Sequence, residues 1–190
     1  MLNVVLVEPE IPANTGNIGR TCVLTGSRLH LVGPIGFDLS DKAVQRAGLA
    51  YWENLDVVTY SCWEEFVGTA LHGSFERVHL LTKAGGRRYT DSSYKDGDWL
   101  VFGKESAGLS VALLNAHPAL CERIPMLGDD VLANQDEWHR THEELHPELE
   151  RDICGNFVDS RVGQITSLNL SNAVAIVVFE ALRQLDFPHM

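Results

Sequence analysis

The sequence predicts an α/β protein in which a mostly parallel sheet carries helices on both faces. Two observations lead to this fold class. Short, β-branched apolar runs alternate with helical patterns, and loops rich in glycine or small polar residues follow several of the apolar runs. The chain has 190 residues, of which 45% are hydrophobic, enough for one substantial core. We therefore expect a single domain over residues 1–190.

Strand and helix patterns alternate regularly through the first half of the chain. Apolar, β-branched runs predict strands over residues 2–7, 29–32, 56–59 and 77–82. The segments between and after them predict helices over residues 14–24, 41–47 and 62–71. Asn14 is a good N-cap for the first helix, and Gly26 suits the position just after its end. Because parallel strands need crossover connections, these helices are expected to cover the sheet.

A polar, turn-rich stretch over residues 83–98 separates the two halves. After it, the pattern predicts strands over 99–102 and 120–125 and helices over 110–116 and 168–185. Ser167 and Asn169 lead into the last helix, which is amphipathic and rich in apolar residues.

One segment, residues 127–166, differs from the rest of the chain in composition. It contains ten acidic and three basic residues, a local net charge of −7, and little apolar content. A helix is expected in its middle, over residues 135–149. We interpret the segment as an insertion on the surface of the domain.

Charge and cysteine content narrow the classes of function. A net charge of −11 argues against broad nucleic-acid binding, although the 150 residues outside the acidic segment carry only −4. A local basic surface is therefore compatible with the sequence. No apolar run approaches about 20 residues, so neither a membrane span nor a signal peptide is expected. The four cysteines form no C-x-x-C pair, which fits a reducing cytoplasm.

Three loops are candidates for a ligand site: residues 14–20, 102–109 and 166–173. In a parallel sheet the carboxyl ends of the strands share one edge, so loops that follow them can line one cleft. Glycine would let the backbone approach a ligand closely. Tight turns with helix caps are the alternative interpretation of each loop. A dinucleotide fingerprint is disfavoured, because the first loop has only Gly16 and Gly19 and the next strand lacks the acid expected after it.

Taken together, the loops resemble those of the knotted SPOUT-class RNA methyltransferases. The closest resemblance is to the small single-domain branch that methylates the ribose 2′-hydroxyl of the tRNA wobble nucleotide, position 34. It covers residues 1–126 and 167–188 and rests on the segments VVLVEPEIPANTGNIGRTC, DGDWLVFGKESAGL, IPM and SLNLSNAVAIVVFEALRQL. The resemblance implies a deep trefoil knot in the carboxyl-terminal part, S-adenosylmethionine as cofactor, tRNA as substrate and a homodimer in the cytoplasm.

The resemblance also implies which residues form the site. The expected cofactor contacts are Leu81 or Thr82, Gly103, Ile124, Met126, Ser167 and Leu168, the last closing on the adenine. The expected catalytic position is Arg20, with Glu105 and Asn169 in support. Because a guanidinium stays protonated at neutral pH, we expect Arg20 to grip a phosphate and stabilise the developing alkoxide.

The acidic segment is where the chain departs from the family pattern. About forty residues separate IPM from the S-x-N-x-S loop, and Thr166 stands before Ser167 where relatives often have arginine. This departure from the family pattern bears most on the choice of RNA substrate. The alternatives to methylation at position 34 are therefore methylation of rRNA or of another tRNA position, or a catalytically inactive knotted RNA-binding protein.

A metal site in the acidic segment is a further hypothesis that the sequence raises. His139, His142 and His146 could share one helical face, with Cys154 beyond them. A solvated acidic helix explains the same pattern, so no metal is expected.

Overall fold

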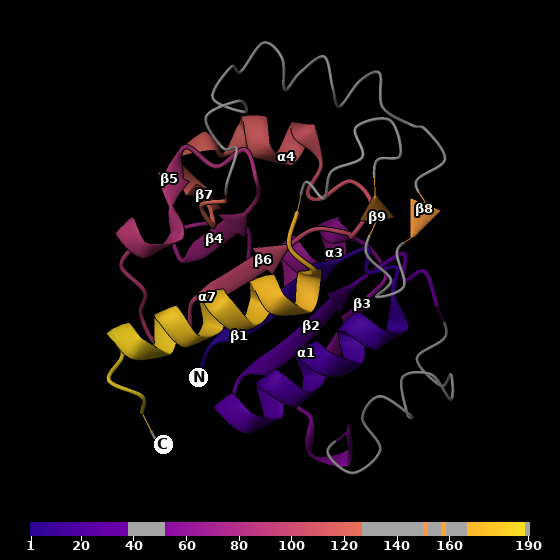
Figure 1. Cartoon of the computed structure of the whole chain (residues 1–190), viewed down its shortest axis with the longest axis horizontal. Coiled ribbons are helices and arrows are strands. Elements are labelled where there is room, and N and C mark those ends of the chain that lie inside the picture. The colour runs from indigo at the N-terminus through magenta and orange to yellow at the C-terminus, as the bar shows by residue number, and fades with distance from the viewer. Residues whose placement is uncertain (38–51, 127–149, 152–156, 159–166, 189–190) are drawn as a thin grey trace.

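The computed structural model describes residues 1–37, 52–126, 150–151, 157–158 and 167–188. Their main feature is a seven-stranded sheet in the order β3-β2-β1-β6-β4-β7-β5, and every neighbouring pair in it is parallel (Figure 1). The strands are β1 (Asn3–Val7), β2 (Arg28–Val32), β3 (Val57–Tyr60), β4 (Val78–Leu81), β5 (Arg87–Arg88), β6 (Trp99–Phe102) and β7 (Cys121–Arg123). The predicted α/β fold class is confirmed.

Helices cover both faces of this sheet. They are α1 (Pro12–Thr25), α3 (Trp63–Thr69), α4 (Val111–Ala116) and α7 (Leu170–Gln184), with 3₁₀ turns η1 (Trp52–Asn54), η2 (Tyr89–Asp91) and η3 (Pro118–Leu120). The helices α1 and α7 contact each other and lie across the near face in Figure 1. A separate antiparallel ladder joins β8 (Glu150–Arg151) and β9 (Phe157–Val158).

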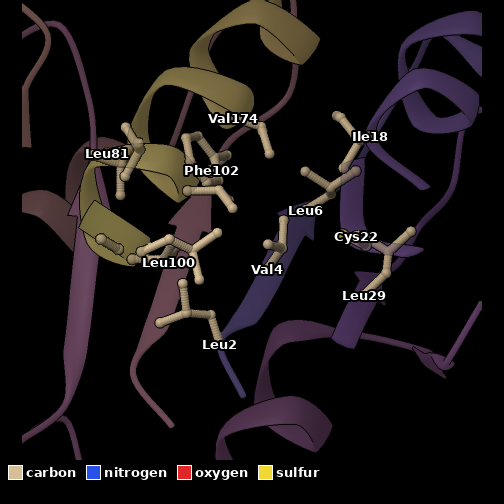
Figure 2. Close-up of a cluster of buried hydrophobic side chains, with 14 of the residues drawn as sticks. Leu2, Val4, Leu6, Ile18, Cys22, Leu29, Leu81, Leu100, Phe102 and Val174 are labelled. Atoms are coloured by element: carbon tan, nitrogen blue, oxygen red, sulfur yellow. The ribbon is translucent and has the colours of Figure 1, made fainter. Parts of the chain in front are cut away.

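The larger hydrophobic core lies between the sheet and the helices α1 and α7. Figure 2 shows Val4 and Leu6 of β1 close to Ile18 of α1, with Val174 of α7 beside them. All four side chains are fully buried. Since each such side chain contributes about 1.5–3 kcal/mol, the core holds both helices firmly against the strands.

A second core lies on the opposite face. Val5 of β1 and Leu80 of β4 point to this side, where Phe66 of α3 and Leu114 of α4 pack against them. Side chains alternate between the two faces along a strand, and here both faces are buried. This double burial explains why β1 is continuously apolar after Asn3.

Most predicted elements are found, with boundaries shifted by one or two residues. The first helix begins at Pro12, and its N-cap is Ile11 without a side-chain cap, so the prediction of Asn14 as N-cap is wrong. Proline favours the first helical position, which moves the start forward. Gly26 does end this helix in the left-handed conformation, with φ +61°. The predicted helices over 41–47 and 135–149 lie outside the described residues.

The polar stretch before β6 contains an element that the sequence analysis missed. Strand β5 has only two residues, Arg87 and Arg88, and pairs with β7 at the edge of the sheet. Two exposed arginines carry no apolar strand signal, so only their pairing with β7 makes them a strand.

A buried histidine connects the three strands β1, β2 and β3 at one end of the sheet. In His30 of β2, Nδ1 lies 3.0 Å from the Tyr60 hydroxyl and Nε2 lies 3.2 Å from Asn3 Oδ1. Burial, followed by the positive charge of Arg28, lowers the pKa of His30 to about 4. The imidazole is therefore neutral in the folded protein at neutral pH.

This shift predicts a loss of stability in acid. An unfolded histidine has a pKa of about 6.5, so between pH 6.5 and 4 the unfolded chain binds more protons at His30 than the folded one does. The free energy of unfolding should then fall as the pH is lowered through this window, by up to about 3 kcal/mol from His30.

Urea unfolding of the parent and of His30→Gln across this pH range measures the effect. The parent should lose more stability on acidification than the variant, because other titrating groups are common to both proteins. Parallel pH profiles would show that His30 does not contribute.

Candidate functional site

A pocket of about 180 Å³ lies at the edge of the sheet where β4, β6 and β7 end. Its walls come from the segments that follow these strands, from the start of α7 and from one residue of α1, Asn14. The carboxyl edge of a parallel sheet is the usual ligand-binding position in such folds. The structure thus has a concave site where the loop positions predicted one.

The pocket brings together nine of the ten predicted site residues. They are Leu81, Thr82, Gly103, Glu105, Ile124, Met126, Ser167, Leu168 and Asn169. Arg20 is the exception, because it is exposed on α1 and does not line the pocket. Of the three predicted loops, two contribute walls, whereas residues 14–20 belong to α1 and reach the pocket only through Asn14.

The segment after β6, residues 103–109, is called the pocket loop. The carboxylate of Glu105 holds this loop to the start of α1. Its two oxygens accept hydrogen bonds from the backbone N–H groups of Glu10 (2.9 Å) and Ile11 (3.3 Å) and from Asn14 Nδ2 (3.0 Å). A carboxylate at a helix N-terminus also interacts favourably with the helix dipole. With three donors bound, Glu105 is an organising group of the site.

Asn14 extends this connection to the start of α7. Its Oδ1 accepts a hydrogen bond of 2.9 Å from Asn169 Nδ2. Asn169 in turn caps α7, because its Oδ1 accepts from the backbone N–H (2.9 Å) and the hydroxyl (2.6 Å) of Ser171. Asn14 lies in the predicted loop 14–20 but was assigned no role of its own, since its buried side chain gains this role only when α1 and α7 pack together.

Gly103 is required by a close backbone contact within the pocket loop. A Cβ at this position would lie 2.0 Å from the carbonyl carbon of Gly108 and 2.2 Å from the backbone nitrogen of Leu109. The loop closes through a 2.8 Å hydrogen bond from Gly108 N to Lys104 O, with Gly108 at φ +70°. The loop's own backbone is thus by itself a reason for glycine at this position, in addition to the ligand approach that the sequence analysis expected.

The pocket lining includes a buried acidic residue that the sequence analysis did not single out. Glu122 of β7 is fully buried and binds His79 Nδ1 at 2.7 Å, an Arg87 guanidinium nitrogen at 2.9 Å and the Tyr94 hydroxyl at 3.0 Å. The other ring nitrogen of His79 lies 3.2 Å from Asp98. A carboxylate within a strand that is expected to be buried was the available signal for such a network.

Electrostatics in this network favour the charged forms of both central groups. Burial alone would lower the pKa of His79, but its hydrogen bonds to Glu122 and Asp98 outweigh burial and raise it. Burial opposes ionisation of Glu122, yet the bonds from His79 and Tyr94 lower its pKa. Because Ile124 follows β7 directly, this ion-paired network fixes the strand from which the pocket wall continues.

Metal ligation and membrane insertion find no support in the described residues. Across the described ranges, no three His, Cys, Asp or Glu side chains are grouped as metal ligands would be. The histidines at 139, 142 and 146 and Cys154 lie outside those ranges. No helix of the described part is long and apolar enough to cross a bilayer.

Comparison with known proteins shows extensive similarity. Residues 1–130 match the model of the SpoU rRNA Methylase family. A tRNA (cytidine(34)-2′-O)-methyltransferase of Burkholderia pseudomallei (strain 1106a) is 40% identical over 188 residues, which is 98% of this chain and 97% of that protein.

Solved structures show the same fold. One, from work on the 2-OH methylation of C/U34 on tRNA, has a TM-score of 0.74 and 32% identity and covers 98% of this chain and 97% of its own. The AdoMet-bound rRNA methyltransferase of Sinorhizobium meliloti has a TM-score of 0.69 and 25% identity, covering 97% of this chain and 56% of its own.

The close contact at Gly103 predicts a specific sensitivity to a single methyl group. Gly103→Ala should lower the free energy of unfolding by about 1–3 kcal/mol, because the loop backbone must move to admit the Cβ. Gly86→Ala is the matched control, since a Cβ there meets nothing within 4 Å. Urea unfolding of both variants measures the difference, and equal stabilities would contradict the contact.

Proposed function

Because the chain belongs to the SpoU rRNA Methylase family, we propose that it methylates the ribose 2′-hydroxyl of nucleotide 34 in tRNA, using S-adenosylmethionine. The observation that carries this proposal is the convergence of three segments, distant in sequence, on one pocket at the ends of β4, β6 and β7. Similarity to a tRNA (cytidine(34)-2′-O)-methyltransferase extends over nearly the whole chain and supports the choice of substrate.

The pocket suits a cofactor that has an uncharged adenine. Ile124, Met126 and Leu168 offer apolar walls, while the segment around Gly103 offers backbone groups for hydrogen bonds. Leu168 is 40% exposed, which is unusual for a large apolar side chain at a pocket and is explained if it closes on the adenine. Leu81 or Thr82 and Ser167 complete the proposed contacts.

The chemistry asks this chain mainly to position its substrates. S-adenosylmethionine, when bound, supplies an electrophilic methyl group on sulfur that the ribose oxygen displaces, so the leaving thioether needs no acid. Glu105, Asn14 and Asn169 hold the pocket loop, α1 and α7 in fixed relative positions. Arg20, exposed on α1, is proposed to bind a phosphate next to the target ribose and to stabilise the oxygen as it loses its proton.

A second copy of the chain is the proposed partner in the assembly. Leu24 of α1 is 72% exposed and Phe179 of α7 is 48% exposed, with Ile176 also exposed one turn from Phe179. Because α1 and α7 pack against each other, these side chains provide apolar area for a homodimer interface. The proposed location is the cytoplasm, where the substrate tRNA is found and the free thiols of Cys22, Cys62 and Cys121 would stay reduced.

We also propose that residues 1–190 form one knotted domain carrying a surface insertion over residues 127–166. Met126 and Ser167, which flank this segment, both line the pocket, so the segment leaves and rejoins the domain at one place. The backbone at Gly85 passes so close to Glu122 that a Cβ would lie 2.4 Å from its carbonyl carbon, as expected where chain segments thread tightly.

Methylation assays with defined RNAs test the proposed function. The protein should transfer tritiated methyl groups to a tRNA, and a chemically assembled tRNA with a 2′-deoxyribose at nucleotide 34 should accept none. Arg20→Ala should lose most of the transfer yet bind S-adenosylmethionine normally by calorimetry. If tritiated methyl groups are transferred equally to the tRNA with 2′-deoxyribose at nucleotide 34, or are transferred to rRNA instead, the protein methylates another RNA site. Cofactor binding without any transfer would favour an inactive RNA-binding protein.

The proposed homodimer predicts that a charge on the α1–α7 face separates the subunits. Phe179→Glu should give a monomer by size-exclusion chromatography with light scattering, because burying an unpaired carboxylate at an interface is unfavourable. Ala112→Glu, at an exposed position of α4 on the other face of the sheet, is the control and should stay dimeric. A dimer that survives Phe179→Glu would place the interface elsewhere.

A further inference from the structure

Two lysines line the pocket, and their surroundings differ. Burial lowers the pKa of Lys83, so its environment disfavours the ammonium form. Lys104 has 34% of its side chain exposed and lies directly between Gly103 and Glu105 in the pocket loop. Its Nζ is 2.9 Å from Oε2 of Glu8, whose side chain is 39% exposed.

Three carboxylates lie where the pocket loop meets the connection between β1 and α1, and two of them have structural tasks. Glu105 binds the start of α1. Glu10 accepts hydrogen bonds of 2.9 Å from both the backbone N–H and the hydroxyl of Ser106. The carboxylate of Glu8 forms an ion pair with Lys104. Glu8 is therefore the carboxylate that could release its partner without opening the loop.

The backbone at Glu8 adopts a conformation that this residue type rarely takes. Its φ is +51°, in the left-handed region, and its N–H donates a 2.7 Å hydrogen bond to Val32 O. Such a conformation is unfavourable for a residue with a Cβ and persists where neighbouring structure imposes it, often at ligand-binding positions. Here it accompanies the placement of a carboxylate beside Lys104. An exposed ion pair contributes little to the stability of the fold, so stability does not explain the unusual backbone conformation of Glu8.

We propose that Lys104 binds a phosphate of the RNA substrate at the edge of the pocket, and that Glu8 holds and neutralises Lys104 until the phosphate replaces it. This inference rests on the proposed function, because it assigns a substrate contact for that same site. A lysine ammonium on its flexible stem can exchange one oxygen partner for another, and the exposed pair costs little to break. Phosphate contacts position a nucleic acid without reading its sequence.

The neutralising role of Glu8 has a physical reason in the charge of the protein. With a net charge of −11, the chain repels nucleic acid at long range, so each local cation near the site matters for RNA binding. A cation paired with Glu8 attracts RNA less strongly than a free one. The pair thus favours RNA that can present a phosphate at this position over RNA that merely approaches the surface.

RNA binding across a salt series tests the proposal, with every protein saturated with S-adenosylhomocysteine so that cofactor affinity does not enter. Lys104→Ala should weaken binding of an anticodon stem-loop and make the slope of log K against log salt shallower by about 0.7–0.9. Lys104→Arg should keep the parent slope. Glu8→Gln should tighten binding, because it frees Lys104. Lys95→Ala is the matched control, since Lys95 is exposed just before β6, at the opposite edge of the sheet, and should leave the slope unchanged.

The double variant separates this exchange from a general charge effect. If Glu8 acts through Lys104, Glu8→Gln should no longer tighten binding in the Lys104→Ala background. An equal gain in both backgrounds, or an unchanged slope in Lys104→Ala, overturns the proposal. The parent's methylation of tRNA, measured on the same preparation, reports separately on the proposed function, so the two can fail independently.

Discussion

The geometry of the candidate site depends on the hydrogen bonds that the Glu105 carboxylate accepts. It joins the β6 loop to the connection between β1 and α1 by accepting two backbone N–H groups and the amide of Asn14. Asn14 then binds Asn169, and Asn169 caps α7. Each buried donor that is left without an acceptor lowers the free energy of unfolding by about 1–3 kcal/mol. Removing the Glu105 carboxylate would leave three donors without their acceptor at once. Glu105 thus links the pocket loop to α1, and through Asn14 to α7, at the end of the helices that the core already holds in place.

The sheet could be predicted from the sequence because its strands are buried on both faces. Double burial requires continuous apolar runs such as residues 4–7, which are strong local signals. The order of the strands could not be predicted in the same way. That order depends on contacts between distant segments, as β1 pairs with both β2 and β6. Strand β5 is the clearest case, since Arg87 and Arg88 form a strand only by pairing with β7.

Motifs predicted nine wall residues of the pocket, but they did not reveal how the site is held together. Asn14 and Glu122 act through partners that are distant in sequence, so the residues next to them in the chain do not identify those partners. Gly103 shows a related limit. The sequence indicated that glycine matters at this position, but the contact with the backbone of Gly108 exists only in the folded loop and could not be predicted.

Met126 and Ser167 stand at one pocket although forty residues separate them. A chain that leaves and returns at the same point can change in length or composition between those residues without displacing either wall. A change confined to the segment between them would therefore leave both pocket walls in place. The same arrangement makes this position suitable for grafting an affinity tag or a foreign RNA-binding module, because the graft would sit beside the site without interrupting the sheet.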